Sequence, residues 1–223
     1  MALVMVHLLV AREWAMKHPE YLESAEYYYG AIAPDAIHVR DGNDKSRKNE
    51  IHFCNWSGSR PHLMKAYWLN HRTPFDVGYA VHCLTDGLWV DGYKRSFPGL
   101  LLPDGRADPH AYYNDVYATE RALFAETPEV PHMLQMIARA ETPADHEQLY
   151  SHEFEQWRAN VLKEYDLQHP AIGAWRTKSY LEMGLPAPDD HDPVYITPQY
   201  IHRFMHETVS TIEDILRRYE CDE

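Results

Sequence analysis

Apolar residues recur at helical spacing along most of this chain, and polar segments bearing glycine and proline separate the apolar blocks. A period near 3.6 residues is typical of helices that bury one face. Helices are predicted over residues 3–17, after Pro61, after Thr73-Pro74, from His110 onward, over residues 131–140 and 144–165, and after Thr197-Pro198. No stretch alternates convincingly with the two-residue period of a strand. The pattern therefore predicts an all-α fold.

Three polar or irregular segments separate these helices. Residues 30–36 (GAIAPDA) are predicted to form a turn, because a proline biases the residue before it away from helical geometry. Residues 40–50 are dense in turn formers and are expected to form a surface loop. Residues 97–109 form the longest irregular connection. Helices joined by such segments are compatible with one multi-helical domain.

Composition and length are those of an ordinary globular protein, with 45% hydrophobic and 25% charged residues among 223. We expect a single domain over residues 1–223, with its motifs in residues 1–120 and a helical portion in residues 121–223. The formal net charge of −13 disfavours a stable nucleic-acid complex and adsorption to an anionic membrane. A small phosphorylated substrate stays compatible with this charge, because a bound metal supplies positive charge locally.

Cysteine content and possible targeting segments indicate the cellular compartment. The three cysteines are widely spaced, so no disulfide framework and no CxxC zinc site is expected. The apolar residues 1–11 lack a basic n-region and a convincing cleavage site, so they are expected to begin the first helix. No segment approaches the length of a transmembrane span, and membrane insertion is not expected. These features together predict a cytoplasmic protein.

The most informative pair is His82 and Asp86, four residues apart within the apolar segment 77–90 (VGYAVHCLTDGLWV). Residues at i and i+4 share one face of a helix, so both side chains point into the same space. A helix that is apolar almost all round is normally buried, and a buried carboxylate needs a partner. Two partners stay open at this point: a hydrogen bond between the two side chains, or a divalent cation that both bind.

Three further residues extend the hypothesis of a metal site. His7 lies in the first apolar helix, Asp35 in a Pro-Asp turn, and His52 after the polar loop. Each also has an ordinary role open to it, as a hydrogen-bonded core histidine, a turn residue and a loop residue. Taken with His82 and Asp86, they make a mixed nitrogen and oxygen donor set that suits zinc, iron or manganese better than calcium.

The order of these residues resembles a known family. The segments GAIAPDAIH, NEIHF and VGYAVHCLTDGLW resemble the bacterial zinc-dependent phospholipase C family, within the phospholipase C/P1 nuclease superfamily. The opening VHLLVARE is similar to the start of that family, and YYND is similar to a segment of its uncharacterised bacterial members. The resemblance covers about the first 120 residues, and the remaining part of the chain is similar only in its helical character.

The resemblance implies an all-α fold with a cluster of up to three zinc ions. It implies one metal held by Asp35, His52, His82 and Asp86. It implies a neighbouring metal held by His7, with Asp86 as the bridge between the two ions. Asp35 and Asp86 are the residues that we expect to take part in catalysis.

Ligands for further metals are harder to place. In the family an HxxxE pair follows the HxxxD, and no convincing HxxxE follows it here. The acidic, amide and imidazole residues available after the helical pair are Asp91, Asp108, His110, Asn114 and Asp115. Asp115, within YYND, is the preferred metal ligand among them, and a capping or surface role is its alternative.

The expected function is metal-assisted hydrolysis of a small soluble phosphoester, because a bound metal lowers the pKa of water towards about 7 and neutralises developing charge. The basic run Lys45, Arg47 and Lys48 either reaches a substrate phosphate or forms a solvated loop. Two alternatives stay open. One is a nuclease-like phosphodiesterase, which the net charge disfavours. The other is a non-catalytic, metal-stabilised helical binding module.

Overall fold

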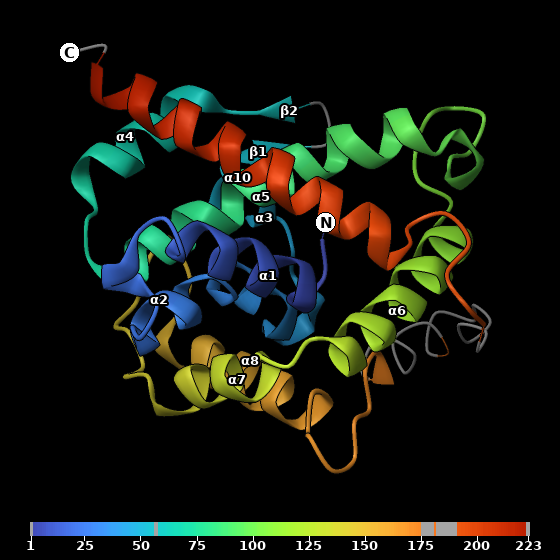
Figure 1. Ribbon diagram of the computed structural model, residues 1–223. Helices are drawn as coiled ribbons and strands as arrows, with labels where there is room; N and C mark the ends of the chain where they lie inside the picture. The colour runs from blue at the N-terminus through green and yellow to red at the C-terminus, as the bar shows by residue number, and fades with distance from the viewer. Residues whose placement is uncertain (1, 56–57, 175–180, 182–190, 222–223) are drawn as a thin grey trace.

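The computed structural model describes residues 2–55, 58–174, 181 and 191–221, which form a helical fold (Figure 1). Its α-helices are α1 (Val4–Ala15), α2 (Ala25–Gly30), α3 (Lys48–Ile51), α4 (Pro61–Asn70), α5 (Pro74–Ser96), α6 (Pro109–Glu126), α7 (Val130–Arg139), α8 (Ser151–Glu164) and α10 (Pro198–Cys221). Short 3-10 helices are η1 (Pro19–Tyr21), η2 (Ala33–Val39), η3 (Asp41–Asn43) and η4 (Pro98–Leu100). Strands β1 (Cys54–Asn55) and β2 (Gly58–Ser59) form a small antiparallel hairpin. The predicted all-α fold is confirmed, and this hairpin is the departure from it.

Helix α5 is the central element of the fold and packs against α1, α2, α4 and α10. Helix α10 also lies along α1, and Figure 1 shows it above α1 and crossing in front of α5. Helices α7 and α8 lie on the other side, where α7 packs on α2 and α8 packs on η2. Polar side chains that α1, η2 and α5 direct inward therefore meet in the interior.

The start of α5, predicted after Thr73-Pro74, is fixed by a capping box. The Asp76 backbone N–H donates to Thr73 Oγ1 at 3.2 Å, and the Thr73 N–H donates back to Asp76 Oδ2 at 2.9 Å. Pro74 follows in the first turn, where its missing N–H costs nothing. The helix predicted after Thr197-Pro198 is α10, and Thr197 caps it, because the Tyr200 N–H donates to Thr197 Oγ1 at 3.2 Å.

Two glycines let α2 and α5 approach closely. A Cβ atom added at Gly30 would lie 2.1 Å from the Phe75 carbonyl oxygen, and one at Gly78 would lie 2.1 Å from the Tyr27 carbonyl oxygen. Both neighbours are backbone atoms, so any side chain would force the helices apart. The close approach brings the carbonyl of Ala31, just past α2, to the interior face of α5.

The helix predicted over 144–165 begins later than expected, at Ser151. The residues before it form a tight turn, in which the His146 N–H donates to the Leu149 carbonyl at 2.9 Å and the Leu149 N–H returns a bond at 2.8 Å. These two hydrogen bonds hold residues 146–149 in a turn, so the helix cannot extend back to residue 144 as predicted.

The segments predicted as a turn and a loop contain short helices. Residues 30–36 lead into η2, with Pro34 in its first turn. Residues 40–50 contain η3 and most of α3. Helices this short show little helical periodicity in the sequence, so they could not be told from loops of the same composition.

Buried aromatic and aliphatic side chains fill the core, and Tyr27, Tyr79 and Trp89 are among the largest that are fully buried. None of the described helices combines the length and the apolar character that crossing a membrane requires. The core instead encloses several buried polar groups, and these define the site described next.

Candidate metal centre

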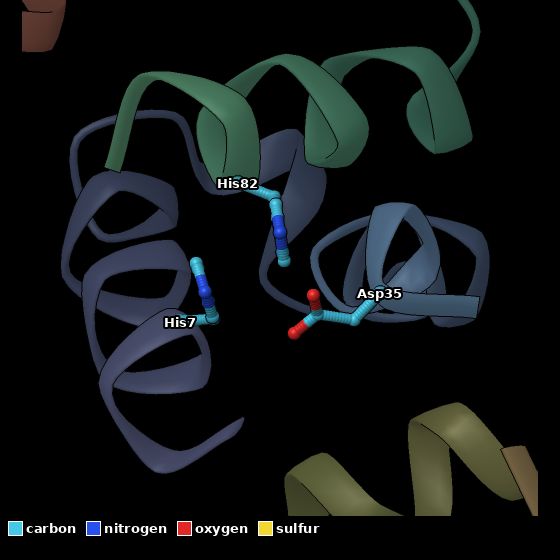
Figure 2. A group of neighbouring side chains, drawn as sticks. All are labelled: His7, Asp35 and His82. Carbon is cyan, nitrogen blue, oxygen red and sulfur yellow. The ribbon is translucent and has the colours of Figure 1, made fainter. Parts of the chain in front are cut away.

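Five of the six predicted metal ligands come together in the interior. His7 lies on α1, Asp35 in η2, His52 just after α3, and His82 and Asp86 on α5. Each is at most 5% exposed to solvent. Figure 2 shows three of them, His7, Asp35 and His82, pointing toward one another from three separate elements. Long-range packing thus assembles residues that are far apart in the sequence.

Backbone carbonyls orient two of the imidazoles. His82 Nδ1 donates to the Ala31 carbonyl oxygen at 2.8 Å, and His52 Nδ1 donates to the Lys48 carbonyl oxygen at 3.0 Å. A carbonyl only accepts, so each Nδ1 carries a proton, and Nε2 of each ring is the atom that faces the centre. Histidines that bind metals usually donate their second ring N–H in this way.

The distances between nitrogen and oxygen atoms in the centre are those expected between two ligands of one metal ion, and they are longer than those of short ion pairs. His52 Nε2 lies 3.3 Å from Asp35 Oδ1 and 3.8 Å from Asp86 Oδ2, and His7 Nε2 lies 3.5 Å from Asp86 Oδ1. Charge-assisted N–H···O hydrogen bonds are about 2.7–2.9 Å long. Two ligands about 2.1 Å from one tetrahedral ion lie about 3.4 Å apart, which matches the observed separations better.

Several buried polar atoms lack the hydrogen bonds that buried atoms normally make. Among the described residues, no hydrogen-bond partner faces either ring nitrogen of His7, Nε2 of His82 or Oδ2 of Asp86. Buried polar groups are rarely left in this state, because an unmade hydrogen bond costs about 1–3 kcal/mol. A cation bound between these atoms would satisfy them together, so the residues fit a metal ion.

Burial and the neighbouring charges set the protonation states. Burial, together with the nearby imidazole of His7, lowers the pKa of His82 to about 3. Burial acts to raise the pKa of Asp35, but the neighbouring imidazoles of His38 and His52 outweigh it and hold that pKa well below its usual range. The pKa of Asp86 is also lowered, because contact with His7 outweighs burial. At neutral pH the centre therefore presents a neutral imidazole and two carboxylates.

The ligand atoms fall into two overlapping groups. Nitrogen and oxygen atoms of His7, Asp35 and His82 lie within 4.8 Å of one another, and so do those of His52, His82 and Asp86. A neutral imidazole has one lone pair, so His82 can bind only one ion at a time. A second ion would therefore need a bridging carboxylate. Asp86, which lies near both His7 and His52, has the position that the resemblance implies for such a bridge.

The N-terminal end of α1 is anchored to the same region. Asp86 Oδ1 accepts a hydrogen bond from the Ala2 backbone N–H at 2.9 Å. Glu120 accepts the Met5 N–H at 3.1 Å. Glu120 also accepts the hydroxyl of Tyr165. These bonds fix the first turn of α1 and so the position of His7, which follows one turn later.

His38 was missed in the sequence and lies beside the centre. Its Nε2 atom is 3.4 Å from Asp35 Oδ1 and 2.9 Å from Lys48 Nζ. The spacing Asp35-x-x-His38 on one turn of η2 was the available signal. Lys48 thus lies next to a residue that supports the centre, whereas Arg47 pairs with Glu50 at the surface.

Asp115 does not join the centre in the part of the chain that the structure describes. Its carboxylate accepts backbone N–H groups of the segment before α10: Val194 at 2.6 Å, Tyr195 at 3.1 Å, and Ile196. Both oxygens therefore hold that segment. Asp115 is buried, and this role is neither that of a ligand in the centre nor the capping or surface role named as its alternative. Asp108 caps α6, where its Oδ1 accepts the His110 N–H at 2.9 Å.

A cavity of about 240 Å³ adjoins the centre at His52. Its apolar wall consists of Phe53, Pro61, Met64, Leu84, Leu88 and Ile215. Asp91 on α5 and Arg218 on α10 also line it, and both are exposed, whereas His52 is buried. The cavity therefore leads from the surface to the edge of the centre.

No family model, no curated protein and no solved structure matches this chain. The resemblance to the zinc-dependent phospholipase C family thus stays a prediction. The evidence for a possible metal centre is the geometry and burial of its own residues.

Proposed function

We propose that this protein is a metal-dependent phosphoesterase that hydrolyses a small soluble phosphoester at the buried centre. The observation that carries the proposal is the convergence of unpartnered buried lone pairs, on His7, His82 and Asp86, with the carboxylate of Asp35. Such a donor set suits zinc best, and iron or manganese also suit it. The order of these residues, which resembles the phospholipase C family, supports phosphoester chemistry.

The chemistry divides between the ions and the chain. When bound, the metal would lower the pKa of water to about 7 and neutralise charge on the phosphoryl group. The chain would hold the ions through His7, His52 and His82. Asp35 and Asp86, which we assign to catalysis, would also hold the ions, and a carboxylate oxygen not engaged by an ion would accept the proton that the attacking water loses. As the water oxygen bonds to phosphorus, the ester P–O bond breaks, and the leaving oxygen takes up a proton and departs as the alcohol.

The adjoining cavity supplies a route for the substrate. Its apolar wall excludes water from the edge of the centre, which strengthens electrostatic interactions there. Arg218 at its mouth is a guanidinium suited to bind a phosphate oxygen. In a chain with a net charge of −13, such a local cation matters for an anionic substrate. The volume of about 240 Å³ suits a small ester rather than a polynucleotide.

The primary experiment measures metal content and hydrolysis together. The purified protein, loaded with Zn²⁺, Mn²⁺ or Fe²⁺, is assayed on p-nitrophenyl phosphate and bis(p-nitrophenyl) phosphate. We expect hydrolysis that chelation abolishes and that Asp86→Asn removes. The control Asp104→Asn alters an exposed carboxylate paired with Arg106 and should retain activity. A metal-loaded protein that hydrolyses neither ester would refute the proposal.

A second experiment tests the cavity. Arg218→Ala should raise KM for the hydrolysed ester about tenfold or more, in line with loss of one charge-assisted hydrogen bond. Arg217→Ala is the matched control, because Arg217 is equally close to the end of α10 but pairs with Asp214 and does not line the cavity. Equal KM values for the two variants would show that the substrate does not use this route.

One observation favours a second function, a metal-stabilised module without turnover. All five ligands are buried, as ligands of a structural metal site are. In that case chelation would lower the melting temperature, and no phosphoester would be hydrolysed. The nuclease alternative is tested in the same assay by adding single-stranded DNA and RNA, and we expect no cleavage.

A further inference from the structure

A second group of potential metal ligands lies away from the buried centre. His71 follows α4, Asp76 lies in the first turn of α5, and His146 begins the tight turn before α8. One ligand atom from each lies within 4.8 Å of the other two. The side chain of His71 is 38% exposed and that of His146 is 16% exposed, so this group is accessible to solvent.

The separations in this group are those of atoms that share an ion. His146 Nε2 lies 3.6 Å from Asp76 Oδ1, and His71 Nδ1 lies 4.0 Å from the same oxygen. Both are too long for hydrogen bonds. Ligands of one tetrahedral ion lie about 3.4 Å apart, so a contraction of a few tenths of an ångström would complete a site.

Neighbouring groups hold two of these side chains in place. Asp76 Oδ2 accepts the Thr73 backbone N–H at 2.9 Å and the Thr73 hydroxyl at 2.7 Å, so Oδ1 is the oxygen that faces the histidines. The Tyr67 hydroxyl lies 2.9 Å from His146 Nε2 and 3.4 Å from Asp76 Oδ1, and an ion bound by these two atoms would replace those contacts. The ring of His71 stacks on Tyr67, with centroids 4.6 Å apart. Its Nε2 atom lies 4.0 Å from Glu147 Oε1, so a carboxylate backs the ring on the side away from Asp76. At this separation no hydrogen bond is made, so Glu147 would support a metal-bound His71, as carboxylates support ligand histidines, after the two side chains close by about 1 Å.

The turn that carries His146 and Glu147 has an unusual backbone. Glu147 and Gln148 both adopt positive φ angles, 46° and 67°. Two consecutive left-handed residues make a type I′ turn, which normally contains asparagine or glycine. Here the turn holds His146 and Glu147 on either side of His71, at the expense of local strain.

We propose that His71, Asp76 and His146 form a second site for a divalent transition-metal ion, with Glu147 as the residue that positions His71. Two imidazoles and one carboxylate make a nitrogen-rich set that binds zinc rather than calcium or magnesium. Water from the exposed side completes the coordination. The ion ties the turn before α8 to α4 and α5, and this role is independent of phosphoester hydrolysis.

The test is Zn²⁺ binding by isothermal titration calorimetry on the full chain. We expect His71→Ala to lose one equivalent of bound Zn²⁺ relative to the unaltered protein, and Asp86→Asn to retain that equivalent. Glu147→Gln should weaken this equivalent about 10- to 100-fold, as loss of a supporting carboxylate does. His206→Ala is the matched control, because His206 is an exposed histidine beside Glu13 and should bind no ion.

A second readout locates the ion. Diethyl pyrocarbonate modifies accessible histidines, and peptide mass spectrometry identifies them. Zn²⁺ at one equivalent above the capacity of the buried centre should protect His71 and leave His206 reactive. Unchanged stoichiometry in a folded His71→Ala protein, or equal modification of His71 with and without Zn²⁺, would overturn the proposal. Because Glu147→Gln alters only a side chain that is 28% exposed, it keeps the test valid if His71→Ala does not fold.

Discussion

The carboxyl group of Glu120 makes the stability of this protein depend on pH near neutrality. It accepts the backbone N–H of Met5 and of Val6, in the turn of α1 that precedes His7. Burial raises the pKa of Glu120 from 4.5 to about 7, although these bonds and the Tyr165 hydroxyl act to lower it. The folded protein therefore keeps the proton up to a pH of about 7, whereas the unfolded chain releases it near 4.5.

The sign and size of the effect follow from linkage. A raised pKa stabilises the fold fully below the unfolded value of 4.5, and this contribution is lost as the pH rises through about 7. Each pKa unit is worth about 1.4 kcal/mol, so the whole contribution is about 3 kcal/mol. For a chain of this length that corresponds to a fall in melting temperature of about 6–12 °C.

Replacement of Glu120 by glutamine removes the titration while keeping a carbonyl oxygen for the Met5 and Val6 N–H groups. Thermal unfolding is followed by circular dichroism between pH 5 and pH 8, with a chelator present so that metal binding does not contribute. The unaltered protein should lose about 2.5 kcal/mol over this range relative to Glu120→Gln, because part of the contribution is already lost at pH 5. Glu126→Gln, on the exposed side of the same helix, should follow the unaltered protein. Parallel pH profiles for the unaltered protein and Glu120→Gln would refute the reasoning.

Two further variants test the fold around the centre. Gly78→Ala should destabilise the protein by about 3 kcal/mol or more, because its Cβ would lie 2.1 Å from a backbone oxygen. Gly92→Ala, on the same helix, should be tolerated, because its nearest neighbour would be a tyrosine hydroxyl at 3.2 Å. Equal melting temperatures for the two would contradict the close approach of α2 and α5. Arg40→Ala should cost about 3–5 kcal/mol in urea unfolding, because it leaves the carboxylate of Glu153, 2% exposed, without its partner at 2.6 Å. Arg47→Ala breaks an exposed pair and should leave the unfolding midpoint almost unchanged, so a similar loss in both variants would argue against the buried pair.

The sequence predicted best the part of the centre that depends on the spacing of nearby residues, which is the pair His82 and Asp86. His82 and Asp86 share a helix face because they are four residues apart, and their apolar surroundings predict burial. Spacing left the choice between a hydrogen bond and a metal open. The structure adds what spacing lacks: His82 Nδ1 is already used by the Ala31 carbonyl, so Nε2 is directed at the other ligands.

Residues whose roles depend on distant partners were not predictable in this way. Asp115 accepts hydrogen bonds from backbone N–H groups of a segment about 80 residues later, and no local sequence pattern indicates such a contact. His71 and Asp76 meet His146 only because the chain turns before α8, where a continued helix was predicted. By contrast, the place of His38 beside Asp35 follows from a single helical turn, and could have been predicted.

The most direct test of the metal centre is anomalous scattering from a crystal, measured at the zinc, iron and manganese edges. We expect a peak about 2.0–2.1 Å from His82 Nε2, with Asp35 or Asp86 among the other ligands of that ion. A second peak bridged by Asp86 and bound by His7 would establish the two-ion arrangement. A metal-saturated crystal with no anomalous peak among these five residues would contradict the central claim.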